Sequence, residues 1–206
     1  MNTKSLFILL LSLFLLRPLL GQKAQSDSSY SKFFLSTSAF MAMNLVEQPD
    51  PPRFFMLNFG YRFTPKDAII VEAISWQYFA PLGIPYGPDK GNKEEFFPGF
   101  ARDYGVGLAY QRILWKELYS TFHATPFLQQ YFNTEAEKLQ TGFQLFLTWR
   151  FGYRFQVFKK KLFIEPSVAF TSWPINTNLP ESFQRLEDKW PKYFLFEPGL
   201  HIGYNF

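Results

Sequence analysis

One pair of side chains in this sequence has the composition of a hydrolytic site. His123 and Thr125 lie two residues apart, and the acidic residues Glu135 and Glu137 follow in the next polar stretch. An imidazole base, a hydroxyl nucleophile and a carboxylate are the groups that nucleophilic acyl transfer uses. Residues two apart share a face only on a β-strand. Whether the pair can react therefore depends on the element that holds it and on the side to which it faces.

Other chemistry finds little support in the sequence. Cysteine is absent, which excludes disulfides, thiolate metal sites, a cysteine nucleophile and a lipoprotein anchor. The only two histidines, His123 and His201, lie far apart without regular carboxylate spacing, so we predict no metal and no cofactor. No phosphate-binding glycine motif occurs. The longest basic run is only residues 159–161, so no nucleic-acid partner is expected.

The elements that carry these residues are predicted to be β-strands. From residue 30 onward, apolar and polar residues alternate with a period of two. In segment 142–158 an apolar face opposes Arg150 and Arg154, whereas the alternation in 68–79 is poor and leaves its facing open. We predict eight strands, at about 32–44, 54–63, 68–79, 100–114, 118–132, 142–158, 162–173 and 193–206.

The connections between these segments alternate in length. Segments 64–67, 115–117 and 159–161 are short, while the long ones are 45–53, 80–99, 133–141 and 174–192. This alternation is typical of an outer-membrane barrel with short periplasmic turns and longer external loops. We predict an all-β fold: an eight-stranded antiparallel transmembrane up-and-down β-barrel of residues 32–206, with both termini periplasmic. A soluble barrel or sandwich would need a polar outward face, which segment 142–158 does not offer.

The N-terminal residues have the pattern of a secretory signal. Lys4 precedes an apolar run over residues 6–16, which is too short to span a bilayer as a helix. We predict a signal peptide of residues 1–21, with cleavage as late as residue 24, followed by a short periplasmic segment of residues 22–31. The alternative is a buried N-terminal helix.

The C-terminal segment resembles the insertion signal of outer-membrane proteins. That pattern ends in Phe and repeats apolar residues at every second position, here Leu200, Ile202, Tyr204 and Phe206. The mature chain as a whole resembles the small eight-stranded outer-membrane β-barrel superfamily of the OmpA, OmpX and OmpW kind, without an interior motif that identifies a subfamily. The resemblance implies contact with outer-membrane lipid and lipopolysaccharide. It also implies periplasmic chaperones and the insertion machinery as partners during biogenesis.

An eight-stranded barrel has an interior just wide enough for side chains to fill it. Inward charges of both signs would then pair with one another, because unpaired buried charges are costly. We expect Glu72 in the lumen near Arg62, although it stands among isoleucines. The expected lumen network is Arg62, Glu72, Asp103, His123, Arg150, Arg154, Glu165, Glu197 and His201.

Three functions are compatible with the predicted barrel. The first is a non-enzymatic barrel with a structural or binding role, in which the aromatic and charged loops 80–99 and 174–192 contact lipopolysaccharide, a glycan or a partner protein; the alternative is that these loops are only solvated. The second is a lipid-A-modifying hydrolase. Some small outer-membrane barrels that resemble this chain use a His-x-Ser pair for this reaction, but Thr125 replaces the serine here and His123 is predicted inward. The third is a narrow, porin-like channel for small solutes.

Overall fold

The structure is a computed structural model that describes residues 30–82, 88–89 and 91–206. The predicted signal peptide, residues 1–21, lies outside the described residues, as does most of segment 22–31. The unit described below comprises Ser31–Phe206. None of its helices is long and apolar enough to cross a membrane.

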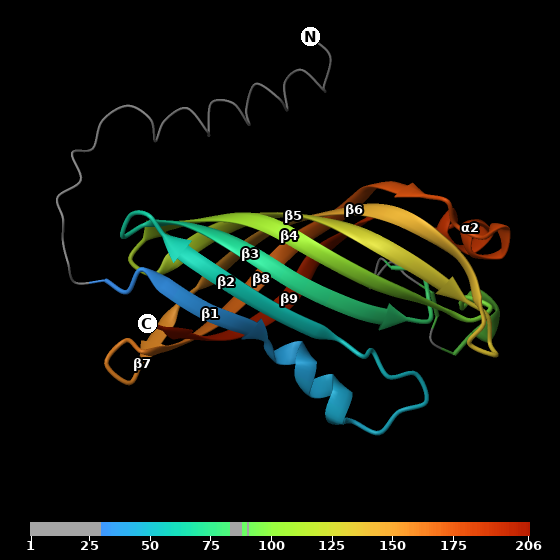
Figure 1. Cartoon of the computed structure of the whole chain (residues 1–206), viewed down its shortest axis with the longest axis horizontal. Helices are drawn as coiled ribbons and strands as arrows, with labels where there is room; N and C mark the ends of the chain where they lie inside the picture. Colours follow the sequence, from blue (N-terminus) through green and yellow to red (C-terminus); the bar gives the residue numbers. More distant parts are fainter. Residues whose placement is uncertain (1–29, 83–87, 90) are drawn as a thin grey trace, which may run out of the picture. The chain divides into compact units, whose positions relative to one another are not determined.

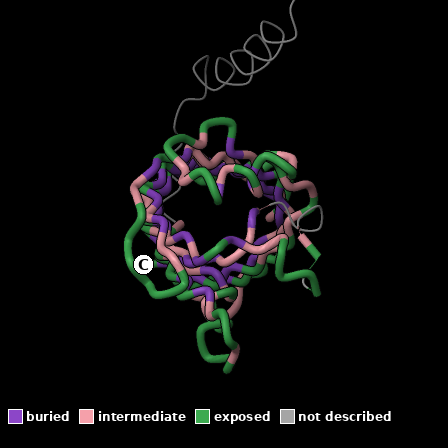
Figure 2. The backbone as a smooth tube through the Cα atoms, turned by 90° about the vertical axis from the view of Figure 1, so that its right-hand side faces the viewer, coloured by how far each residue is buried: buried purple, intermediate pink, exposed green. Residues whose placement is uncertain are grey.

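All strands of this unit belong to one antiparallel sheet (Figure 1). β7 continues β6 beyond Arg154, and both pair with β8, so together they make one strand of the ring. β1 pairs with β9, which closes a ring of eight strands (Figure 2). The strands are β1 Phe33–Ser38, β2 Phe55–Arg62, β3 Asp67–Tyr78, β4 Phe100–Trp115, β5 Leu118–Phe132, β6 Lys138–Tyr153, β7 Phe155–Val157, β8 Leu162–Thr177 and β9 Tyr193–Asn205. The predicted all-β class and the up-and-down order of eight strands are confirmed.

The two ends of the ring differ. Tight turns join β2 to β3, β4 to β5 and β7 to β8 at one end, which we call the turn end. The longer connections lie at the other end, the loop end, together with the short helix α2, Glu181–Glu187 (Figure 1). Among the described residues, two 3-10 helices occur in the connections, η2 at Ala39–Leu45 and η3 at Lys93–Glu95.

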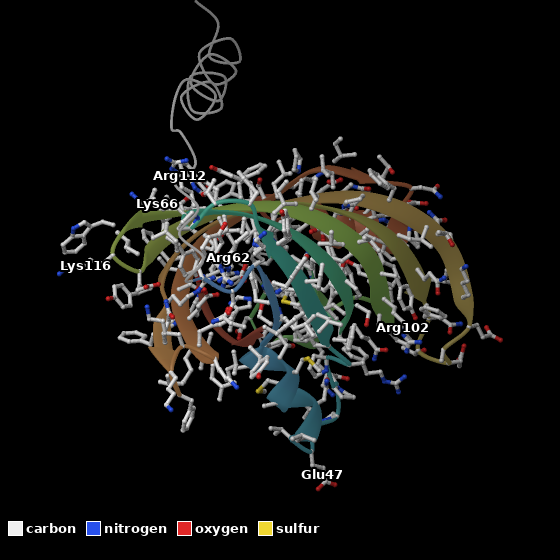
Figure 3. The ribbon with its side chains drawn as sticks, turned by 60° about the vertical axis from the view of Figure 1, so that its left-hand side comes forward. Glu47, Arg62, Lys66, Arg102, Arg112 and Lys116 are labelled. Carbon is white, nitrogen blue, oxygen red and sulfur yellow. The ribbon has the colours of Figure 1, made fainter. Side chains whose placement is uncertain are left out.

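Side chains alternate between the outside and the inside of the ring. On β5, Thr121, Thr125 and Gln129 are buried, whereas Phe122 and Leu128 are exposed. The same distribution recurs on the other strands. Inward positions are mostly polar or small, and outward positions are mostly large and apolar. Two outward arginines, Arg102 and Arg112, lie near opposite ends of β4 (Figure 3).

The first predicted strand is too long. β1 ends at Ser38 rather than near residue 44, because Ser38 caps a helical segment: its Oγ accepts a hydrogen bond from the Phe40 amide at 3.2 Å. The following residues are mainly Ala, Met and Leu, which are good helix formers. Met41 and Met43, which the predicted strand of residues 32–44 would place on one face, therefore belong to η2.

The last predicted strand contains an irregularity. Phe196 has a positive φ of 62°, and the pairing of β8 with β9 shifts register between Ala169 and Thr171. This bulge adds one residue to β9, which reverses the alternation beyond it. Phe194 consequently lies opposite the inward Thr171, and not on the face of Phe196 as the pattern predicts.

Candidate functional site

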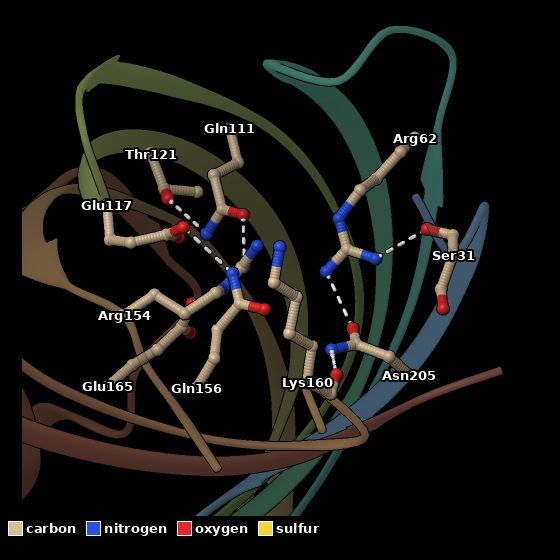
Figure 4. Close-up of polar contacts among 10 residues, drawn as sticks. All are labelled: Ser31, Arg62, Gln111, Glu117, Thr121, Arg154, Gln156, Lys160, Glu165 and Asn205. Atoms are coloured by element: carbon tan, nitrogen blue, oxygen red, sulfur yellow. Dashed lines mark hydrogen bonds and ion pairs between the residues drawn. The ribbon is translucent and has the colours of Figure 1, made fainter. Parts of the chain in front are cut away.

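The turn end of the ring interior is filled by a buried ion pair. Arg154 donates from Nε to Glu165 Oε1 at 2.6 Å and from Nη2 to Gln111 Oε1 at 2.7 Å (Figure 4). Gln111 in turn donates to Thr121 Oγ1 at 3.2 Å. The side chains of Arg154 and Glu165 are only 4% and 6% exposed, so the pair is shielded from solvent, and the neutral Gln111 accepts a further hydrogen bond from the arginine.

In the same region, a second arginine links the segment before β1 to the C-terminal end of β9. Arg62 donates to Asn205 Oδ1 at 2.9 Å and to the Ser31 carbonyl at 2.8 Å, and Asn205 donates to the Lys160 carbonyl at 2.7 Å (Figure 4). Its guanidinium carbon lies 4.3 Å from the centre of the Phe34 ring. Cation–π contact over a buried ring is favourable. Arg62 is therefore held both by its hydrogen bonds and by the stacking of its guanidinium on Phe34.

The middle of the interior contains Glu72, which faces inward from β3. It accepts a hydrogen bond from Thr125 Oγ1 at 3.0 Å, and its Oε2 lies 3.6 Å from His123 Nδ1. In register, Glu72 lies opposite Asn58, four residues along β2 from Arg62. Glu72 therefore contacts side chains of β5, whereas the sequence analysis predicted that it would lie near Arg62.

A second group in the middle layer surrounds Arg150. This residue donates to Ser167 Oγ at 3.0 Å and to Glu197 Oε1 at 3.3 Å. Arg150, His123 and His201 line a cavity of about 20 Å³. That volume holds about one water molecule, so the middle layer has no space for an organic substrate.

The arrangement of His123 and Thr125 differs from that of a catalytic triad. Both side chains face the ring interior, and the threonine hydroxyl donates to Glu72 rather than to the imidazole. Glu135 and Glu137 lie in the exposed connection after β5, where both accept from Asn133 Nδ2, at 3.0 and 2.9 Å. The carboxylate beside the pair is therefore Glu72. Sequence reasoning missed it because the contact depends on the register across β3, β4 and β5.

At the loop end, polar side chains form a hydrogen-bond network beneath the connections. Gln129 donates to the Tyr78 hydroxyl at 2.7 Å and to Asp103 Oδ2 at 3.3 Å, and Tyr131 donates to Gln129 Oε1 at 2.8 Å. Asp103 is 1% exposed. The deepest acid of the expected network is thus held by a neutral amide, with none of the expected arginines among its hydrogen-bond partners.

Helix α2 covers this layer. Phe183 is fully buried and packs on Phe97 and Tyr131, with ring centroids 4.6 and 5.1 Å apart. Glu187 is also buried and accepts from Trp173 Nε1 at 3.0 Å and from Asn176 Nδ2 at 3.3 Å. Burial raises the pKa of the Glu187 carboxyl above its ordinary value, against the opposing effect of these hydrogen bonds.

The sequence contains a signal for α2 that the strand pattern obscured. Pro180 stands directly before the helix, Phe183 and Leu186 are three residues apart, and Glu181 and Arg185 form an i,i+4 ion pair at 2.7 Å. Proline at a helix start, apolar residues at this spacing and such a pair are helix features.

No family model, curated protein or solved structure matches this chain. Its function is therefore inferred from the geometry of the ring. The described residues contain no cluster of three or more His, Asp or Glu side chains able to hold a metal ion. The interior is occupied instead by three layers of polar side chains, many of them hydrogen-bonded to one another, with Phe183 and its neighbours above the outermost layer.

Proposed function

We propose that this chain is an integral outer-membrane β-barrel protein with a side-chain-filled lumen, which acts in a structural or binding role through its loop end. Export by the signal peptide of residues 1–21, and insertion guided by the strand that ends at Phe206, are part of this proposal. The observation that carries it is the inverted facing of the ring, with large apolar side chains outside and polar side chains inside.

The outward side chains of β4 support the transmembrane orientation. Between the outward Arg102 and Arg112, the outward positions carry Tyr104, Val106, Leu108 and Tyr110. Ten residues of strand cover ~33 Å, which at a tilt of ~40° corresponds to ~25 Å along the barrel axis, the height of a barrel's lipid-facing band. Soluble monomers rarely expose an apolar surface of this extent.

Aromatic side chains flank this band. At the turn end, Phe33 packs on Tyr61 and Phe206, with centroids 5.2 and 6.2 Å apart. At the loop end, Phe100 stacks on Phe132 at 4.8 Å. Girdles of aromatic residues at both interfaces are typical of outer-membrane barrels. The two groups fit the two interfaces of one bilayer.

The filled interior favours a binding or structural role over the two alternatives. A solute would have to displace the Arg154–Glu165 pair and the Phe183 cover, which argues against a channel. A lipid-A hydrolase would need His123 and Thr125 to reach the membrane, but Thr125 is buried inside the ring and His123 faces the same side. The loop end, where α2 and the long connections gather, remains the surface for a glycan, protein or lipid partner.

A single substitution tests the lipid-facing band. Leu108 is 59% exposed on the outside of β4. In water Leu108→Arg would change stability little, whereas near the middle of a bilayer it costs about 2–4 kcal/mol. The matched control is Leu45→Arg, at the end of η2, where the leucine is 88% exposed. We expect Leu108→Arg alone to lower the yield of folded, heat-modifiable protein in lipid vesicles and to weaken its resistance to urea.

Two outcomes would contradict the proposal. If both variants fold equally well and the protein fractionates with soluble proteins, the ring does not lie in a membrane. If the wild-type protein conducts ions steadily in a planar bilayer, the lumen is an open channel. Unchanged lipid A after incubation with the purified protein, measured by mass spectrometry, would exclude the hydrolase.

A further inference from the structure

The outer surface of the ring has a hollow on the loop-end half of β3 and β4. Its volume is about 510 Å³, within the range of small-molecule pockets. In register, Ser75 lies between Phe55 and Tyr104, and Ala73 lies opposite Val106. The hollow exists because two small side chains on β3 alternate with large ones on the neighbouring strands. Its walls are mainly apolar, which suits a hydrocarbon chain.

A polar row borders this hollow on its loop-end side. Arg102 pairs in register with Gln77 on β3 and with Gln130 on β5, and each of these residues is two positions from a residue that lines the hollow. Arg102 donates from Nε and Nη2 to Gln77 Oε1, at 3.3 and 2.6 Å. Its guanidinium lies 5.7 and 5.6 Å from the rings of Phe100 and Phe132. The side chain is thus held in place on the outer surface.

The charge of Arg102 is not balanced by an acid. Within the described part of the chain, no carboxylate forms an ion pair with it, whereas Arg112 at the other end of β4 pairs with Asp67 at 2.7 Å. A guanidinium has five N–H donors, and the hydrogen bonds to Gln77 use two of them. The remaining donors can bind an anion, and phosphate is, with carboxylate, one of the two anionic groups whose geometry an arginine fork matches.

We propose that Arg102 and the adjoining hollow form a binding site for one phosphorylated glycolipid of the lipid A type, in the membrane leaflet at the loop end. Arg102 binds a phosphate while the buried amide of Gln77 holds its guanidinium, the amide of Gln130 faces the hydroxyl-rich headgroup, and one acyl chain lies over Ala73 and Ser75. The inference rests on the proposed function, since it requires the outer surface of the ring to face lipid.

The experiment uses the full protein in neutral detergent micelles and counts bound lipid by native mass spectrometry. The probe is diphosphoryl lipid A, compared with its dephosphorylated form and with phosphatidylglycerol. We expect Arg102→Gln to weaken binding of the diphosphoryl probe about tenfold, the effect of losing one charge-assisted contact. Arg112→Gln is the control on the same strand and should bind as the wild type does. Dephosphorylated lipid A should bind wild type and Arg102→Gln equally weakly.

A second pair of variants tests the hollow separately. Ala73→Phe fills it, whereas Val71→Phe places the same ring two residues away on the same face, outside the hollow. Only Ala73→Phe should reduce lipid A binding. The proposal is overturned if phosphatidylglycerol binds as tightly as lipid A, if both arginine variants lose affinity equally, or if Ala73→Phe has no effect. Heat-modifiable migration in vesicles is recorded for every variant. Failure of the wild type there refutes the proposed function, whereas normal insertion without lipid A binding refutes only this site.

Discussion

Phe183 of α2 stacks on Phe97, with ring centroids 4.6 Å apart and an interplanar angle of 29°. The two residues come from different connections, one before β4 and one before β9. Their contact joins two loops over the loop end of the ring, together with Tyr78, Ala101 and Tyr131. A short exposed helix would be unstable by itself, so α2 depends on this buried aromatic contact for its position.

Replacing Phe183 should release α2 without unfolding the ring. Phe→Ala in a packed site costs about 3–5 kcal/mol, which exceeds what a seven-residue helix can supply from its own hydrogen bonds. The chain contains no cysteine, so a spin label at Arg185→Cys reports α2 alone. We expect slow label motion in the parent and fast motion after Phe183→Ala. Ser182→Ala, exposed on the same helix, should leave the label unchanged; equal motion in all three proteins would show that α2 is not held by Phe183.

The docking of α2 should weaken as the pH rises. Burial raises the pKa of Glu187 above its ordinary value of 4.5, so the docked state binds a proton more tightly than the undocked state. The stabilisation is complete below the ordinary pKa and is lost as the pH rises through the raised pKa of the docked state. The same spin label should become more mobile as the pH is raised above the ordinary carboxyl pKa of 4.5. Glu187→Gln keeps an acceptor for Trp173 and should abolish this dependence; a pH response that persists in this variant would assign it to another group.

The Arg154–Glu165 pair allows a comparison of breaking and replacing a buried ion pair. Arg154→Met leaves a buried carboxylate without its cation, which should cost about 3–5 kcal/mol of unfolding free energy. The double variant Arg154→Met with Glu165→Gln should recover most of that loss. Arg185→Met, which breaks an exposed pair, should cost at most about 1 kcal/mol. Urea unfolding in vesicles measures all three, and a double variant no more stable than Arg154→Met would show that the charges are not coupled.

Gly60 is required by close packing inside the ring. A Cβ at this position would overlap the ring of Phe34, the residue on which Arg62 stacks. Gly60→Ala should therefore destabilise the fold by about 1–3 kcal/mol, and Phe34→Leu in the same chain should relieve part of the overlap. Gly91→Ala is the control, because its added Cβ would meet only Asp89, at 3.4 Å. Thermal unfolding in micelles distinguishes these cases.

The strands could be predicted from sequence because each of their faces meets one environment. On β5 the pattern predicts residues 118–132 and the structure has Leu118–Phe132, since the inward positions there, apart from Phe127, carry a polar group and most outward ones are apolar. The pattern fails where its period is interrupted. Ala39–Leu45 alternates acceptably as a strand, and the helical cap at Ser38 decides its conformation. The bulge at Phe196 shifts the alternation by one residue, and the pattern of apolar and polar residues does not indicate it.

The interior contacts depend on information that one sequence does not carry. Alternation places Thr125 inside, but only the register across three strands places Glu72 beside it. The Glu187 contacts depend on the fold of a loop rather than on strand periodicity. The outer hollow likewise arises from Ser75 standing opposite Phe55 and Tyr104 on different strands. In each case the sequence predicts which residue types lie on a face, but not which residues of other strands or loops they contact.

The pairing of β1 with β9 has a kinetic consequence. The Phe33 and Phe206 backbones exchange hydrogen bonds at 3.3 and 3.0 Å, so the contact that removes the last free strand edge joins residues from opposite ends of the described chain. Loop-closure entropy makes so distant a pairing slow and late. Until it forms, an almost complete sheet exposes two edges that can pair with another molecule. The concentration of the unfolded chain should therefore determine whether the ring closes on itself or the chains aggregate.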